Sequence, residues 1–262
     1  MQSNNISKIF FLVISVATFI SIFSCKKDTT TTPVTTTAMG KLILHFHTNV
    51  DTNEVDTYDT TYILPSGRKI SVHLAQQFIS HIQAVKLDGS VVDLSGVSIL
   101  KTMENEEYLI GDIPVGNYKS VNFSVGLDAA SNATSPTSSS IFNTSNMWFN
   151  SVYNNSEGYV FLNFQGKIDT TTKANGTIAN MQPFVYRIGT NAHLINITMP
   201  EKDFTVLANL ESYVHIIIDY SKLFTSVQLN QSSDLSVATV AENSSTVANK
   251  ISNNILSIFS YE

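Results

Sequence analysis

Short blocks in which apolar and polar residues alternate recur along most of the chain, and this alternation is typical of half-buried β-strands. In residues 41–48 (KLILHFHT), Leu42, Leu44 and Phe46 would face one side of a strand, and His45 and His47 the other. Similar blocks occupy residues 62–64, 70–72, 82–87, 91–94, 108–110, 120–126, 158–164, 184–188, 194–199, 203–210 and 214–218. The pattern therefore predicts a mainly β fold.

One long helix is predicted at the C-terminal end, over residues 244–259. Apolar residues recur there at helical spacing, at Val247, Ile251, Ile255 and Ile258, and Asn243 is a suitable cap for the start. The Pro65–Gly67 turn predicts a hairpin between residues 62–64 and 70–72, because proline presets φ and glycine accepts a positive φ. Many strands followed by one helix indicate an antiparallel β-sandwich or barrel-like domain with the C-terminal helix packed against it.

The N-terminal segment has the layout of a secretory signal. Lys8 precedes an uncharged, largely apolar run over residues 9–23, which is short for a transmembrane helix. The small residue Ser24 and then Cys25 follow, and residues 22–25 resemble the lipobox of bacterial lipoproteins. We therefore expect residues 1–24 to be removed as a lipoprotein signal peptide and Cys25 to carry the lipid that anchors the protein to the membrane.

Cysteine usage supports this interpretation, because Cys25 is the only cysteine in the chain. The exported protein would then have no disulfide and no thiolate metal cluster. Residues 25–39 are rich in threonine and read as a tether, which leaves residues 40–262 as one domain. We expect the protein in the cell envelope at the outer membrane, on either its periplasmic face or the cell surface.

Charge and motifs exclude several classes of function. The net charge is −6 and only 14% of residues are charged, so no cluster of Lys and Arg exists that could neutralise nucleic-acid phosphates. The chain has no G-x-S-x-G elbow, no H-E-x-x-H zinc helix and no glycine-rich phosphate loop. We therefore expect no nucleic-acid partner and no enzymatic activity.

His45 and His47 are the only pair of histidines whose spacing in the sequence predicts that both could bind one metal ion. Residues i and i+2 of a strand share a face, with their roots about 7 Å apart, so two imidazoles can converge on one ion. Imidazole is a good ligand for copper, zinc or nickel. The alternative is two polar side chains on a half-exposed strand. The other four histidines are isolated in sequence and could join only across space: His73, His81, His193 and His215.

Several segments, taken in order, resemble the MbnP-like copper-binding family, which often occurs as lipoproteins in Bacteroidetes. The matching segments are residues 46–47, 77–82, 87–89, 113–118, 121–128, 147–148, 158–162, 165–166 and 184–189, and the final segment with Asn254 and Phe259. The resemblance covers most of residues 40–262. It implies a sandwich-like periplasmic domain that binds copper through two histidines and an oxidised tryptophan (kynurenine), which a partner di-haem peroxidase-like enzyme produces.

Carried over residue by residue, the resemblance places His47 at the first ligand histidine and His45 at the tryptophan. Arg187 stands where the family has its second histidine, and a guanidinium cannot ligate a metal. His45 could then replace the lost ligand, and His193, six residues beyond Arg187, could supply another. Two hypotheses follow: a copper-binding or copper-handling module, or a metal-free envelope module that keeps the fold and contacts a protein or glycan.

Overall fold

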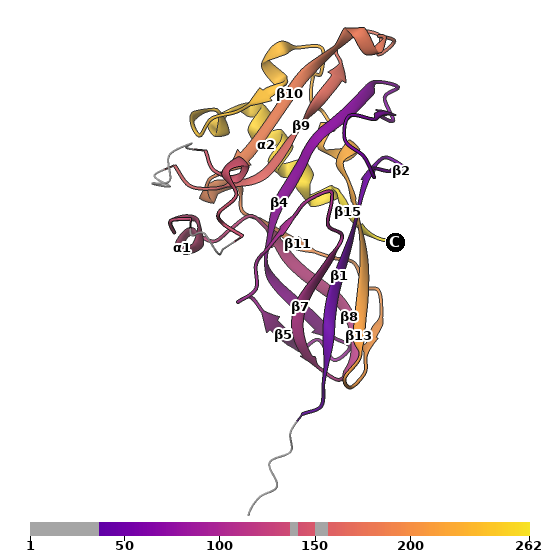
Figure 1. Cartoon of the computed structure of the whole chain (residues 1–262), viewed down its shortest axis with the longest axis vertical. Coiled ribbons are helices and arrows are strands. Elements are labelled where there is room, and N and C mark those ends of the chain that lie inside the picture. Colours follow the sequence, from indigo (N-terminus) through magenta and orange to yellow (C-terminus); the bar gives the residue numbers. More distant parts are fainter. Residues whose placement is uncertain (1–36, 137–140, 150–156) are drawn as a thin grey trace, which may run out of the picture. The chain divides into compact units, whose positions relative to one another are not determined.

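Two β-sheets face each other across a shared hydrophobic core (Figure 1). The computed structural model describes residues 37–136, 141–149 and 157–262. All of these residues belong to one compact unit. The expected signal peptide, Cys25 and residues 25–36 of the tether lie outside the described residues. Within the part of the chain that is described, no helix has the length and apolar character needed to cross a bilayer.

The smaller sheet has five strands, with β1 (Met39–Val50) at its centre. β1 runs parallel to β13 on one side and antiparallel to β7 and β2 on the other. The remaining bounds are β13 (Glu211–Asp219), β7 (Glu107–Pro114), β2 (Asn53–Glu54) and the last strand β15 (Phe259–Tyr261), which pairs with β13.

The larger sheet has ten strands around β4 (Lys69–Lys86), which is 18 residues long. Its main path is β11 (Ile195–Thr198), β8 (Gly116–Val125), β4, β9 (Val160–Asp169), β10 (Met181–Gly189) and β14 (Ser236–Val237). Four short strands pair along its sides: β3 (Thr61–Ile63), β5 (Val91–Leu94) and β6 (Ile99–Lys101) with β4, and β12 (Phe204–Val206) with β8.

The inner face of β1 supplies part of the core. Leu42, Leu44 and Phe46 are fully buried, and the Phe46 ring meets the rings of Tyr108 and Phe123 edge-on, with centroids 6.1 and 6.0 Å apart. Because side chains alternate along a strand, His45 and His47 project from the opposite, outer face. Burial of one face thus fixes the direction in which both histidines point.

The mainly β fold with a packed C-terminal helix is confirmed, and so is the hairpin, in which Tyr62 pairs with Ile70. One long strand was not predicted in full. β4 joins the blocks at residues 70–72 and 82–87 into one strand. Both faces are buried over residues 77–80, so no alternation marks the strand there. The predicted block at residues 203–210 forms only the short β12, because Asn209 turns the chain with φ 60°.

The C-terminal helix is shorter than predicted. It covers only Thr246–Asn254 (α2), and its cap is Ser245, whose hydroxyl accepts from the Ala248 N–H; Asn243 instead accepts from the Gly189 N–H. A short 3-10 turn (Ile255–Ser257) follows, and then β15. The free edge of β13 offers backbone hydrogen bonds to residues 259–261, and this tertiary pairing overrides the helical spacing of the apolar residues.

Gly166 of β9 pairs with Val72 of β4, and we expect Gly166→Ala to destabilise the fold. A Cβ there would lie 2.0 Å from the Ser71 carbonyl oxygen, so the backbones of the two strands would have to separate. Overpacking of this kind costs about 1–3 kcal/mol. Urea unfolding measures the loss. Gly96→Ala is the matched control, because nothing lies within 4 Å of its added Cβ; equal stability losses in both variants would contradict the expectation.

Candidate metal centre

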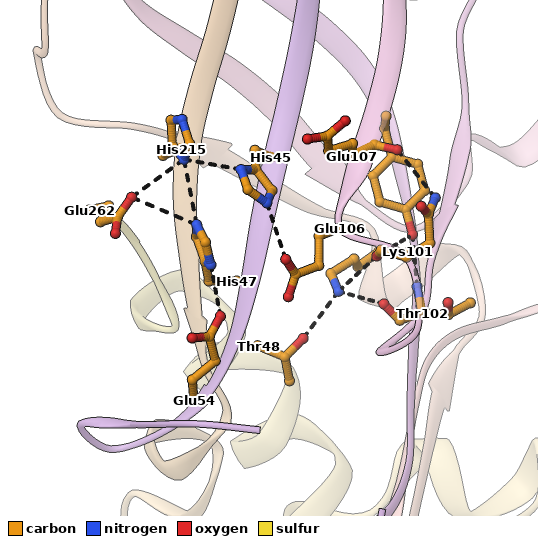
Figure 2. A network of polar contacts seen from close by, with 12 residues as sticks. His45, His47, Thr48, Glu54, Lys101, Thr102, Glu106, Glu107, His215 and Glu262 are labelled. Carbon is orange, nitrogen blue, oxygen red and sulfur yellow. Dashed lines mark hydrogen bonds and ion pairs between the residues drawn. The ribbon is translucent and has the colours of Figure 1, made fainter. Parts of the chain in front are cut away.

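Three histidines from two neighbouring strands converge on the outer face of the small sheet (Figure 2). In the parallel pairing of β1 with β13, His45 lies directly opposite His215, and His47 follows two residues later on the same face. The His45 Nδ1 and His215 Nδ1 atoms are 3.1 Å apart, and the His47 Nε2 and His215 Nδ1 atoms are 3.5 Å apart. The strand register therefore brings three ring nitrogens to one point.

Two carboxylates hold the far nitrogens of the β1 histidines. His45 Nε2 donates to Glu106 Oε2 over 3.1 Å, and His47 Nδ1 donates to Glu54 Oε1 over 2.9 Å. In the neutral imidazole, a proton on the outer nitrogen leaves a lone pair on the inner one. These two hydrogen bonds thus set both rings in the tautomer whose lone pair faces the cluster, which is how protein metal sites orient their histidines.

A third carboxylate completes the ring of donors. Glu262 Oε2 lies 3.4 Å from His215 Nδ1 and 3.7 Å from His47 Nε2 (Figure 2). Zinc-type bonds of 2.0–2.1 Å in a tetrahedral arrangement separate two ligand nitrogens by roughly 3.3–3.4 Å. The observed nitrogen spacings lie on either side of that value. The three imidazoles fit one divalent ion with small side-chain adjustments, and Glu262 lies near two of them, where its carboxylate could serve as a further ligand.

An acidic cleft of about 570 Å³ opens beside His45. Its wall includes the carboxylates of Asp56, Glu104, Glu106 and Glu107. Clefts lined by one sign of charge concentrate ions of the opposite sign. The surroundings of the histidines therefore attract cations, although the protein as a whole carries few charged residues.

Lys101 fixes the loop that carries Glu106. Its side chain is almost fully buried, and the ammonium donates to Thr48 Oγ1 over 3.1 Å and to the Asn105 carbonyl over 3.2 Å, with a further bond to the Thr102 carbonyl (Figure 2). Burial lowers the pKa of Lys101 to about 8. Because Thr48 is the residue after His47, this ammonium ties β1 and the 102–106 loop together directly behind the histidines.

The structure brings His45 and His47 together and places His193 elsewhere. His193 is buried and its Nε2 donates to the Asn243 carbonyl over 2.8 Å. Two groups of described residues have ligand atoms within 4.8 Å of one another: His45, His47 and His215, and His47 with Glu54 and Glu106. His193 belongs to neither group.

Arg187 and Trp148 also lie apart from the three histidines, in a contact of their own. Arg187, on β10 of the large sheet, donates to the carbonyls of Trp148 and Ala238, and its guanidinium lies 5.5 Å from the centre of the Phe149 ring. Trp148 belongs to a second small apolar cluster with Phe78. Arg187, which stands where the resemblance places a second ligand histidine, thus holds residues 148–149 against the large sheet.

Sequence reasoning left His215 as an isolated residue, although the structure makes it the centre of the cluster. The residue lies 170 positions from His45, and no local pattern reveals which strand pairs with which. One weak signal exists: His215 is the only strongly polar side chain in residues 213–218 (YVHIII). A polar residue in so apolar a strand marks an outer face, but it does not name the neighbouring strand.

Comparisons with known proteins agree with this fold. A family model described as MbnP matches residues 39–244. A solved structure, MbnP from Methylosinus trichosporium, is similar with a TM-score of 0.50 and 16% sequence identity, over 73% of this chain and 80% of that one. At that identity the likeness shows a shared fold. A search of curated proteins found no match.

The buried ammonium predicts how stability depends on pH. The pKa of Lys101 is about 8 in the folded chain and has its ordinary value of 10.5 in the unfolded chain, so the unfolded chain binds one more proton between these values. The free energy of unfolding should therefore rise with pH, by about 2–3 kcal/mol between pH 8 and 10. Above pH 10 the raised pKa values of the buried tyrosines, such as Tyr220, act in the opposite direction.

Denaturant unfolding at several pH values would measure this rise. Lys101→Met should flatten the profile between pH 8 and 10, because the variant has no group to titrate there. Lys41→Met removes an exposed lysine from β1 and should keep the rise. Identical slopes in the two variants would show that another group is responsible.

Proposed function

This chain belongs to the MbnP family, and from that premise we propose that it is a lipid-anchored, copper-binding protein of the cell envelope without catalytic activity of its own. The observation that carries the proposal is the convergence of His45, His47 and His215, whose ring nitrogens meet within 3.1 and 3.5 Å. Two of these rings are already held in the tautomer that a metal needs.

Four side chains would hold the ion. The ligand atoms are Nδ1 of His45, Nε2 of His47, Nδ1 of His215 and a carboxylate oxygen of Glu262. Bound copper would supply a strong Lewis acid held by nitrogen and oxygen donors. The protein's part is to orient these donors in advance, since Glu106 and Glu54 fix two rings and Lys101 holds the loop behind them.

The donor chemistry favours copper in its divalent state. Imidazole and carboxylate ligands suit Cu(II), which binds most nitrogen and oxygen sites more tightly than the other divalent first-row ions do. Cu(I) favours soft thiolate and thioether ligands. Cys25, the only cysteine, would be used for the lipid, so the cluster has no thiolate donor. We therefore expect the site to take Cu(II) from its surroundings.

The site needs no oxidised tryptophan. His45 stands at the position where the family resemblance places that residue, and the side chain of His45 is already turned toward His215. The chain's one tryptophan, Trp148, is buried in a different cluster. A di-haem peroxidase-like partner, which the resemblance implies, would find no tryptophan to modify at position 45. We propose that imidazole replaces kynurenine here and that copper binding proceeds without this modification.

The anchor sets the compartment of the proposed activity. Residues 1–24 have the layout of a secretory signal and Cys25 follows a lipobox-like sequence. Attachment of lipid at Cys25 would keep the domain at the outer membrane, where copper ions arrive from outside the cell. A copper carrier or sensor module is consistent with the acidic cleft, whose carboxylates attract cations.

Copper loading tests the assignment. We expect the purified chain to retain stoichiometric Cu(II) after desalting, and its melting temperature to rise, because a ligand that binds only the native state stabilises it. His47→Ala and His215→Ala should lose most of the copper, as measured by elemental analysis. His73→Ala is the matched control, since its side chain is 67% exposed and contacts only Asp59 and Tyr58 among the described partners.

Equal copper in native protein, His47→Ala and His215→Ala would refute the site. A chain that takes up no copper and shows no shift in melting temperature would instead favour a metal-free envelope module with the same fold.

The carboxylate behind His45 should tune the affinity. Glu106→Gln removes the charge that holds the His45 tautomer, and such changes typically weaken metal binding by about 10–100-fold. Competition with a copper chelator of known affinity measures the change. Glu107→Gln, which removes an equal charge from the next residue in the same cleft, should change the affinity much less. If both variants weaken binding equally, the charge of the cleft and not the hydrogen bond sets the affinity.

A further inference from the structure

Five large apolar side chains are exposed at one end of the domain, where β1 begins. Their exposed fractions range from 38 to 54%, and they come from four separate segments. We call this set the apolar tip: Met39, Leu87, Val115, Leu207 and Leu210. Soluble proteins seldom gather apolar side chains at one exposed end unless that end has a binding role.

Backbone hydrogen bonds hold the segments of the tip together. The Val115 N–H donates to the Ala38 carbonyl over 2.9 Å, and the Asn209 N–H donates to the Met39 carbonyl over 2.8 Å. On the other side, the Leu87 N–H donates to the Asn117 carbonyl over 3.3 Å. The β12–β13, β7–β8 and β4–β5 connections thus meet at the lower end of the domain in Figure 1.

The turns themselves do not require these apolar residues. The positive φ angles that the connections need are supplied by Gly89, Gly116 and Asn209. The backbone conformation of these turns does not require leucine or valine at positions 87, 115 and 207. Exposed loop positions more often carry polar residues. We therefore attribute these apolar side chains to a role of the exposed surface and not to the conformation of the turns.

We propose that the apolar tip rests in the surface of the phospholipid bilayer to which Cys25 is anchored. This inference rests on the proposed lipid anchor. Only residues 26–38 separate Cys25 from Met39, and even fully extended they span at most about 45 Å. The tip is the part of the domain next to this segment, so its side chains meet the bilayer first. Burial of apolar area in the boundary between headgroups and acyl chains is favourable.

The opposite end of the domain stays in water. β4 is 18 residues long and ends next to the tip, so its first residue, Lys69, lies roughly 60 Å from the tip along the strand. His45 lies six residues beyond Met39 along β1, roughly 20 Å from the tip. Docking at the tip would therefore hold the histidine cluster above the headgroups, with the outer face of the small sheet turned sideways and open to ions.

A spin label on the lipidated chain tests the docking. Exported protein carrying Leu207→Cys is purified and incorporated into vesicles of phosphatidylethanolamine and phosphatidylglycerol, and a nitroxide is attached to the new thiol. The lipid on Cys25 leaves that thiol as the only free one. Ile178→Cys is the matched control, because Ile178 is 66% exposed and lies near residues 168–169, which pair at the far end of β4.

The proposal expects the label at position 207 to become severalfold less accessible to a water-soluble nickel chelate and more accessible to oxygen after incorporation, with no change at position 178. Adding Leu87→Ser and Leu210→Ser should return the label at position 207 to water. Equal accessibility at both positions, in protein that floats with the vesicles, overturns the docking while the anchor stands.

Two other outcomes also overturn the docking. Reduced access to both nickel and oxygen at position 207 would mean that a second copy of the chain covers the tip. Chain that does not float with the vesicles and takes a second label at Cys25 would refute the lipid anchor, and the docking would fall with it.

Discussion

The candidate metal centre depends on one constraint, the register of the parallel pair formed by β1 and β13. This register sets His45 opposite His215, and it is held by burial of the alternate residues, such as Leu44 opposite Val214. A slip by one residue would turn His215 toward the core and Val214 toward water, so the same apolar burial that stabilises the sheet also keeps the histidines together. Stability and site geometry therefore have a common origin.

Around this pair, the charged groups are arranged by depth. The carboxylates of Glu54 and Glu262 are largely exposed and Glu106 is partly exposed, whereas the Lys101 ammonium lies inside the core behind β1. The exposed carboxylates tolerate their mutual repulsion because water screens them. The buried ammonium is costly, and its three oxygen partners offset that cost while they hold the 102–106 loop in place. Groups on both sides of β1 thus orient the histidines: the carboxylates on its outer face and the Lys101 ammonium on its inner face.

The scaffold is shared with the MbnP family, and the residues around the site differ from those that the family resemblance implies. Position 45 carries an imidazole, and position 187 carries a guanidinium that bonds to the Trp148 carbonyl. If the proposal holds, this fold can bind a metal through ligands from different strands. The buried inner faces of β1 and β13 hold both strands in place, whichever residues occupy their outer faces. The apolar tip would add an orientation to this scaffold, with the metal site held above the headgroups and open to the side.

Much of the fold follows from local sequence patterns. Alternation in residues 41–48 determined which face of β1 is buried and therefore that His45 and His47 share the outer face; the Pro65–Gly67 turn determined the hairpin. The shortened helix and the third histidine did not follow. β15 forms because the edge of β13 is available, and His215 joins the cluster because a strand 170 residues away pairs with β1 in one register. Local patterns report which face of a strand is apolar, whereas strand pairing is a long-range choice made by the packing of the whole core.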